Sequence, residues 1–207
     1  MAIKLLGGSS ITSSSIALPT HKNGDLILIF AYRGTSNTPP SVPTSSATTP
    51  TWITMGSSGS NGTSSILAYA FATRSNHTSG TWTNATRLFV IILQNVASFG
   101  RVVGNSGSSN SINYPELTPQ NINGTSVICA FGVHAFGSST SGIDTPPTGM
   151  RLYFGSNTGS REVFHYSNRG TETGGLGSFS SSNISNIFSG AWRTWVFELK
   201  VKRSNLI

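Results

Sequence analysis

The residues of this sequence best suited to bind a metal ion are four histidines and one cysteine. No two of His21, His77, His134 and His165 stand at metal-ligand spacing, and Cys129 has no histidine at such spacing. His134 and His165 lie in apolar segments and are expected to be core or edge residues. His21 and His77 lie in polar turns and are expected to be exposed. The sequence therefore predicts no metal site.

Acidic residues are the next candidates, because a pair of carboxylates can hydrolyse a glycosidic bond. The six acids are too few and too scattered to indicate such a pair, unless the fold brings two of them together. There is no G-x-S-x-G nucleophile elbow and no Walker loop, and the G-x-G patterns lie in Gly/Ser-rich segments without a following helix. We therefore expect no enzymatic activity, no catalytic residues and no cofactor.

Aromatic side chains are the candidates for binding a glycan or a receptor, because exposed Trp and Tyr rings stack on sugars. Trp52, Trp82 and Tyr153 would serve if the fold gathered them at one end. However, Trp82 and Trp192 both follow Ser-Gly and precede the last strand of their halves. This shared position favours a structural role, as core or rim residues.

The basic residues carry a net charge of +7, from 13 Lys and Arg against 6 Asp and Glu. Most of them are spread singly, and the only cluster is Lys200, Lys202 and Arg203. Nucleic-acid binding usually needs clustered charge with interleaved aromatics, so the distribution argues against it. The cluster instead predicts an assembly contact with an acidic protein surface.

Composition and the N-terminal segment limit the location. Only 9% of residues are charged, against roughly 25% in ordinary proteins, so hydroxyls, amides and backbone make the surface. Cys129 cannot form an intrachain disulfide, and its apolar setting SVICAF predicts a core thiol. The hydrophobic run in MAIKLLGGSS is far too short for the h-region of a signal peptide. No segment approaches the ~18 apolar residues of a membrane span. We expect synthesis in a cytoplasm and no membrane partner.

The elements that would position these residues are short strands. Apolar runs rich in Ile, Val, Phe, Tyr and Trp alternate with Gly, Pro, Asn and Ser clusters, which is typical of an all-β chain. The predicted strands are Ile3 to Leu6, Ser15 to Leu18, Leu26 to Arg33, Trp52 to Met55, Ile66 to Thr73, Arg87 to Gln94, Ser126 to His134, Met150 to Phe154, Glu162 to Ser167 and Arg193 to Lys202.

These strands are of two kinds. In LILIFAY and RLFVIIL both faces are apolar, so each should lie at the centre of a sheet whose outer side is also covered. The cover could be a long loop, a neighbouring subunit or a second domain. In the last strand apolar and polar residues alternate, with Glu198 and Lys200 among the polar set, which predicts one core face and one largely wet face.

The chain repeats itself. GGSSITSSSIALPTHKNGDLILIFAYR, from Gly7, aligns with VGNSGSSNSINYPELTPQNINGTSVICAFGVH, from Val103, and the order of later phrases also matches. In this alignment Asp25 corresponds to Thr125, which argues against a paired acid role. We predict a β-sandwich, jelly-roll-like, built from two similar tandem halves, residues 1–98 and 99–207. The halves could be two small sandwiches or interleave into one.

Several of these phrases resemble a β-sandwich module of bacteriophage virion proteins, found in tail and head accessory proteins. They are GDLILIFAYRGTSNTPPSVP, ILAYAFATR, SGTWTNATRLFVIIL, PPTGMRLYF, REVFHY and WRTWVFELK, and together they cover nearly the whole chain. The module usually reads Gly-Asp-Leu-Leu, Pro-x-Gly-Trp-Thr, Tyr-x-x-Ala and Pro-Gly-Met. This chain departs from it in the stretched PTSSATTPTW and in PPTGM.

The resemblance implies a non-enzymatic structural protein of the virion, made in the host cytoplasm. Its expected role is outer capsid decoration (cement) or tail accessory protein. Its expected partners are the major capsid protein or tail proteins, and we expect a homo-oligomer. The alternative is a receptor-binding or carbohydrate-binding tail protein that uses the aromatic residues named above. The resemblance brings no catalytic residue.

Overall fold

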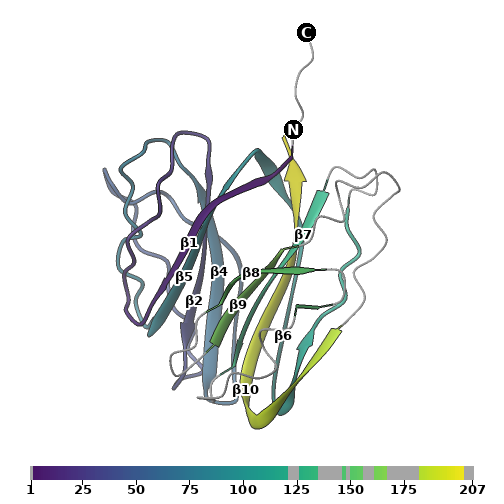
Figure 1. Ribbon diagram of the computed structural model, residues 1–207. Coiled ribbons are helices and arrows are strands. Elements are labelled where there is room, and N and C mark those ends of the chain that lie inside the picture. The colour runs from purple at the N-terminus through teal and green to yellow at the C-terminus, as the bar shows by residue number, and fades with distance from the viewer. Residues whose placement is uncertain are drawn as a thin grey trace. The chain divides into compact units, whose positions relative to one another are not determined.

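The strands of this protein form two antiparallel sheets (Figure 1). The computed structural model describes residues 2–120, 126–134, 146–147, 150–155, 161–166 and 182–202, and no helix occurs among them. The first five strands are β1 (Lys4–Ile11), β2 (Leu26–Arg33), β3 (Ile53–Ser60), β4 (Thr63–Phe71) and β5 (Arg87–Gln94). The other five are β6 (Val96–Tyr114), β7 (Ser126–His134), β8 (Arg151–Gly155), β9 (Arg161–Tyr166) and β10 (Ser182–Val201). The predicted all-β class is confirmed, and two antiparallel sheets are the components of a β-sandwich.

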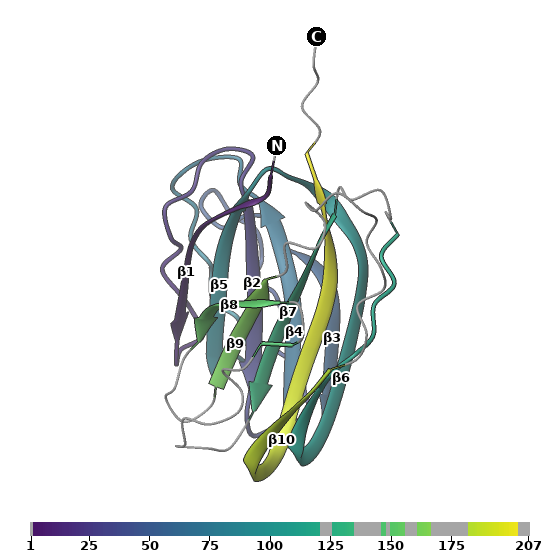
Figure 2. The same cartoon turned by 45° about the vertical axis from the view of Figure 1, so that its right-hand side comes forward.

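The chain divides into two compact units, each of which holds one sheet. We call Ile3–Val96 the N-terminal unit, and Ala97–Ile207 with Met1–Ala2 the C-terminal unit. The strand order is β1-β5-β2-β4-β3 in the first sheet and β6-β10-β7-β9-β8 in the second. In both, the last strand lies between the first and the second, as Figure 2 shows for β10 between β6 and β7. The prediction of two similar tandem halves is therefore confirmed.

Strand register extends this match to single residue pairs. Phe30 of β2 lies opposite Phe89 of β5, and Phe131 of β7 lies opposite Trp195 of β10. Phe89 and Trp195 occupy the same place in RLFVIIL and RTWVFEL. The two central ladders therefore superimpose residue on residue, which the shared strand order alone did not require.

This register identifies a different counterpart for Asp25 in the second half. Because Phe30 corresponds to Phe131, a step back of five residues along each strand places Asp25 against Ser126. The alignment that paired Asp25 with Thr125 is wrong by one residue. The second half carries one more residue between its Asn-Gly pair and the matched phenylalanine. The strand register, rather than the sequence, shows that these two phenylalanines correspond.

The outermost strands β3 and β8 also share an irregularity. The register of β3 against β4 shifts between Thr54 and Gly56, so Met55 is an extra residue. The register of β8 against β9 shifts between Leu152 and Phe154, at Tyr153. In each case the shift follows the second residue pair of the ladder. A β-bulge at the same step of both units belongs to the repeated design.

Loops cover one face of the N-terminal sheet. Ile27 and Ile29 of β2 pack in one buried cluster with Ile16, Trp52 and Trp82, all of which lie between strands. Of the three covers considered for this strand, a long loop is the one found on this face. The alternate residues of β2, such as Leu28, are fully buried as well. Burial on both faces, predicted for LILIFAY and RLFVIIL, is confirmed.

The predicted strand Ser15 to Leu18 is wrong, because this segment is one of the covering loops. Ile16 packs into the core cluster, and its backbone N–H donates to Ser79 Oγ at 2.9 Å. Alternating apolar residues suggested a strand here. The segment instead uses its alternate side chains to cover the sheet while a side-chain oxygen satisfies its backbone.

The C-terminal sheet contains a strand that the sequence did not predict. β6 runs through GNSGSS, where Gly104 and Gly107 face the large rings of β10. A Cβ at Gly104 would lie 2.6 Å from the Trp195 ring, and one at Gly107 would lie 2.5 Å from the Trp192 ring. The small residues of β6 therefore complement the tryptophans of β10, and a strand with few apolar residues results.

A tight turn joins β3 to β4. Asn61 and Gly62 have φ values of 50° and 73°, the left-handed region that type I′ hairpin turns require. The Gly62 N–H donates to Asn37 Oδ1 at 2.8 Å, so the turn also holds a neighbouring loop. This hairpin leads into β4, whose far end reaches the pocket described next.

Candidate functional site

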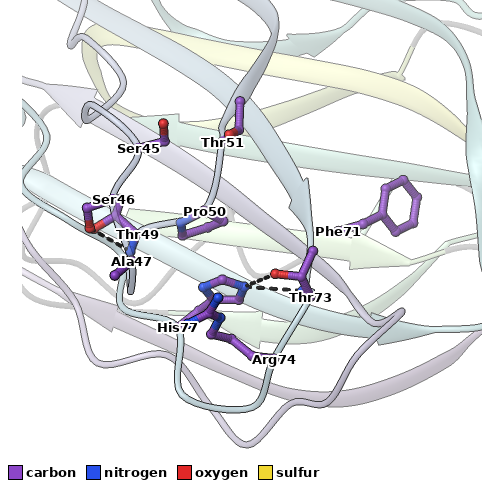
Figure 3. A pocket seen from close by; sticks show the side chains of 10 residues that line it. All are labelled: Ser45, Ser46, Ala47, Thr49, Pro50, Thr51, Phe71, Thr73, Arg74 and His77. Carbon is purple, nitrogen blue, oxygen red and sulfur yellow. Dashed lines mark hydrogen bonds between the residues drawn. The ribbon is translucent and has the colours of Figure 1, made fainter.

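A pocket of about 300 Å³ lies beyond the end of β4 in the N-terminal unit (Figure 3). One wall is the loop 45–51, and the other is the segment 71–77, which continues from β4. The lining side chains are Ser45, Ser46, Ala47, Thr49, Pro50, Thr51, Phe71, Thr73, Arg74 and His77. Five of them carry hydroxyls and one is a cation, so the pocket is polar with small apolar surfaces from Ala47, Pro50 and Phe71.

His77 connects the two walls. The Thr73 N–H donates to His77 Nε2 at 3.2 Å, so this nitrogen carries no hydrogen. The opposite nitrogen, Nδ1, therefore carries the hydrogen and donates to the Thr48 carbonyl oxygen at 3.0 Å. The Thr73 hydroxyl also lies 3.1 Å from Nε2. One imidazole thus fixes the spacing between the loop and the segment after β4.

The expected exposure of the two turn histidines is wrong. His21 is 5% exposed and His77 is 8% exposed. Their rings are stacked, with centroids 6.1 Å apart and planes 8° from parallel. Both lie in turns, as predicted, but these turns fold over the sheet, and the imidazoles hold them there by hydrogen bonds and ring contact.

The loop wall is rigid for a second reason. The Ser46 hydroxyl oxygen accepts from the backbone N–H groups of Thr48 and Thr49, at 3.3 and 3.0 Å. The Ser46 N–H donates to the Thr49 carbonyl at 2.9 Å, and the Thr78 N–H donates to the Thr48 carbonyl at 2.9 Å. Because its own groups satisfy the turn, the wall keeps its shape without a ligand.

Arg74 gives the pocket a positive charge. Between Ile3 and Val96 the sequence has five basic residues and a single acid, Asp25. Asp25 is buried, and its carboxylate accepts from the Lys22 N–H at 2.9 Å. The exposed Arg74 is therefore not neutralised by an acidic residue of its own unit. An anion entering the pocket would meet this guanidinium.

Trp52 and Trp82 belong to the core. Trp82 is 0% exposed and Trp52 is 7% exposed, and their rings meet edge to face at 5.2 Å. The Trp82 indole N–H donates to the Ser79 carbonyl at 3.2 Å. The core interpretation of Trp82 is confirmed, and neither indole offers a face on which a sugar could stack. Tyr153 lies in the other unit, at the bulge of β8, and its side chain is outside the described part of the structure.

The basic cluster near the end of β10 is described only in part. Lys200 is half-buried, and its Nζ donates to Gln120 Oε1 at 3.0 Å. Lys202 is exposed, and Arg203 lies outside the described residues. Lys202 is therefore the member of the cluster with a described, exposed position for contact with a partner.

Glu198 shows that the wet face predicted for the last strand is wrong. Glu198 is 0% exposed, and Thr194, another residue of the predicted wet face, is also fully buried. The Glu198 carboxylate accepts from the Ser126 hydroxyl at 2.6 Å and from the Gln120 N–H at 2.7 Å. It also accepts from the Arg101 N–H at 3.4 Å. Hydrogen bonds from three segments make burial of this polar residue tolerable.

Cys129 is a buried core thiol, as predicted. Burial raises the pKa of this thiol well above its ordinary value of 9.0. The unfolded chain keeps the ordinary value, so above about pH 9 the unfolded state loses its proton first and stability falls.

We expect this alkaline loss to distinguish Cys129 from alanine at that position. Above about pH 9, the free energy of unfolding of the natural protein should fall more steeply than that of Cys129→Ala, by up to about 1.4 kcal/mol per pH unit. Urea unfolding at a series of pH values measures the difference. Parallel pH profiles for the two proteins would contradict the assignment.

Two negative findings complete the description of the site. Across the residues that the structure describes, no group of three or more His, Cys, Asp or Glu is placed to hold a metal ion. Within the same residues, no helix is long and apolar enough to cross a membrane.

The pocket residues were not singled out from the sequence as a site. Arg74 and His77 stand three residues apart in the polar turn ATRSNHTSG, directly after a predicted strand. A cation and an imidazole at a strand end are a usable signal, since binding residues concentrate on such loops. The other wall, however, is the earlier loop 45–51, and no pattern in the sequence connects the two.

The chain was also compared with known proteins. No family model, no curated protein and no solved structure matches it.

Proposed function

We propose that this chain is a non-enzymatic structural protein of a bacteriophage virion, an outer capsid decoration protein or a tail accessory protein. The observation that supports it most is the duplicated unit, with one strand order, one central register and one bulge position in both halves. The resemblance of the quoted phrases to virion β-sandwich modules points in the same direction.

A duplicated unit suits attachment to a repeating lattice. Each half holds a five-stranded sheet with the same strand order, so one chain could offer two similar sheets to two similar neighbours. The surface is poor in charge and rich in hydroxyl and amide groups, which suits broad contact with the major capsid protein or tail proteins. We also propose that copies of the chain associate with one another on the particle.

Imaging of particles tests this proposal. Phage particles produced without this chain would be mixed with the purified protein and examined by electron cryomicroscopy. Density at regular sites over the capsid is the result expected of a decoration protein, and density confined to the tail is that expected of a tail accessory protein. Particles that carry no added density, with a protein shown to be folded, would contradict the proposal.

Lys202 allows a test of how the protein attaches to the particle. The exposed Lys202 should face an acidic partner surface, so Lys202→Glu is expected to reduce the affinity for particles by roughly threefold to tenfold. Lys4→Glu changes the charge by the same amount on β1 of the other unit and should bind as the natural protein does. Occupancy on particles at several protein concentrations measures both. Equal losses in the two variants would show that only net charge matters.

A further inference from the structure

The pocket between the loop 45–51 and the segment 71–77 has the size of a small-ligand site. Its volume of about 300 Å³ is at the lower end of the range for ligand pockets, which suits one sugar ring rather than a longer molecule. The pocket lies entirely within the N-terminal unit. Its shape is held by hydrogen bonds of the protein itself, chiefly those of His77 and Ser46.

The lining indicates which small molecule fits. Ser45, Ser46, Thr49, Thr51 and Thr73 supply hydroxyls, which both donate and accept hydrogen bonds, as sugar hydroxyls do. In Figure 3, Ser45 and Thr51 lie on one side of Pro50, and Thr73 and His77 lie on the other, so the polar side chains of the lining come from both walls. Ala47, Pro50 and Phe71 add apolar surface for the C–H groups of a ring.

The charge of the pocket lining narrows the class of ligand further. Arg74 is the only charged residue of the lining, and a guanidinium pairs with a carboxylate through two parallel hydrogen bonds. A phosphate carries more charge and is usually held by several cations or by converging backbone N–H groups. One guanidinium surrounded by hydroxyls therefore corresponds better to a carboxylate-bearing sugar.

We propose that this pocket binds an acidic monosaccharide unit of a glycan, with Arg74 on the carboxylate and the Ser and Thr hydroxyls on the ring hydroxyls. The binding is independent of where the protein sits on a particle. His77 acts as a positioning residue, because it holds the loop and the segment after β4 at the spacing that the sugar requires.

Amide shifts in the NMR spectrum of the full chain test the proposal, with sodium glucuronate as the probe. Glucuronate should shift the amide signals of residues 45–51 and 73–77, and glucose should shift them much less. Inorganic phosphate, the third arm, should not reproduce the glucuronate pattern. If glucuronate moves no signals of these segments, or if glucose moves them equally, the acidic-sugar proposal is overturned. Equal shifts with phosphate would reduce the site to a general anion site and overturn it too.

Two charge variants make the assignment specific. Arg74→Gln should weaken glucuronate binding at least roughly fivefold, because the charge-assisted pair is lost. Lys4→Gln removes one positive charge from the same unit, on β1, and should leave the affinity unchanged. Arg74 and Lys4 are both exposed, so both variants should fold, and an unperturbed spectrum elsewhere confirms this. Unchanged affinity in Arg74→Gln would overturn the role of the guanidinium.

Discussion

Replacing Glu198 by alanine is expected to lower the free energy of unfolding by about 3–5 kcal/mol. The carboxylate accepts from Ser126 at the start of β7, from Arg101 on β6, and from Gln120 beyond β6. Alanine would leave these donors without this acceptor, and the Ser126 hydroxyl is buried, so water cannot readily replace the carboxylate there. It would also leave a void next to Gly100, whose lack of a side chain makes room for the carboxylate.

Glutamine at this position is the matched control. Its amide oxygen can accept from the Gln120 N–H, while its amide nitrogen can donate to the Ser126 oxygen. Glu198→Gln should therefore cost less than about 2 kcal/mol. Urea unfolding followed by circular dichroism measures both variants. A protein in which Glu198→Ala is as stable as Glu198→Gln would contradict the hydrogen-bonded role of the carboxylate.

Replacing Trp82 by alanine is expected to cost a similar amount, about 3–5 kcal/mol, in the N-terminal unit. Trp82 is fully buried, contacts the ring of Trp52 and packs against β2 residues such as Ile29. Alanine would open a large cavity beneath the covering loops. It would also remove the N–H that satisfies the Ser79 carbonyl.

Phenylalanine at position 82 separates packing from hydrogen bonding. Trp82→Phe keeps most of the buried ring and should recover more than half of the stability lost in Trp82→Ala. Circular dichroism in urea is again the suitable measurement, because the substitutions remove a fluorophore. If Trp82→Ala kept its stability and lost only glycan binding, the residue would be a surface contact and its place in the core would be wrong.

The sequence predicted best the strands whose apolar residues run without interruption. Leu26–Arg33, Arg87–Gln94 and Ser126–His134 were predicted with the bounds that the structure has. These runs are bounded by turn residues and are too short for helices, so only one reading fitted them. The repeated order of such runs was enough to predict two similar halves.

Elements whose form depends on a partner elsewhere in the chain were not predictable. β6 pairs with β10, and its glycines leave room for the tryptophan rings of β10. Because these small residues are also typical of loops, the sequence of β6 alone resembles a loop. The alternation of apolar and polar residues in the last strand predicted that Glu198 is exposed to solvent. Glu198 is instead buried, because Ser126 and Gln120 donate hydrogen bonds to its carboxylate.

The candidate site was predictable only in fragments. Arg74 and His77 are visible in the sequence as polar residues after a strand. That His77 is buried, and that it reaches Thr48 of another loop, depends on how two distant loops fold over the same sheet. Tryptophan was a reasonable candidate for sugar binding by its chemistry, but the same large ring is also what fills the space beneath these loops.

The bulges have a consequence for how the protein behaves in concentrated solution. The outer strands β1, β3 and β8 have an irregular register, at Leu5 to Gly7, Thr54 to Gly56 and Leu152 to Phe154. A flat, regular outer strand offers its free N–H and C=O groups as a template for further chains, whereas a bulge twists them out of line. The net charge of +7 also makes copies of the chain repel one another. We therefore expect backbone geometry at these outer strands to add to charge repulsion in opposing fibrous aggregation.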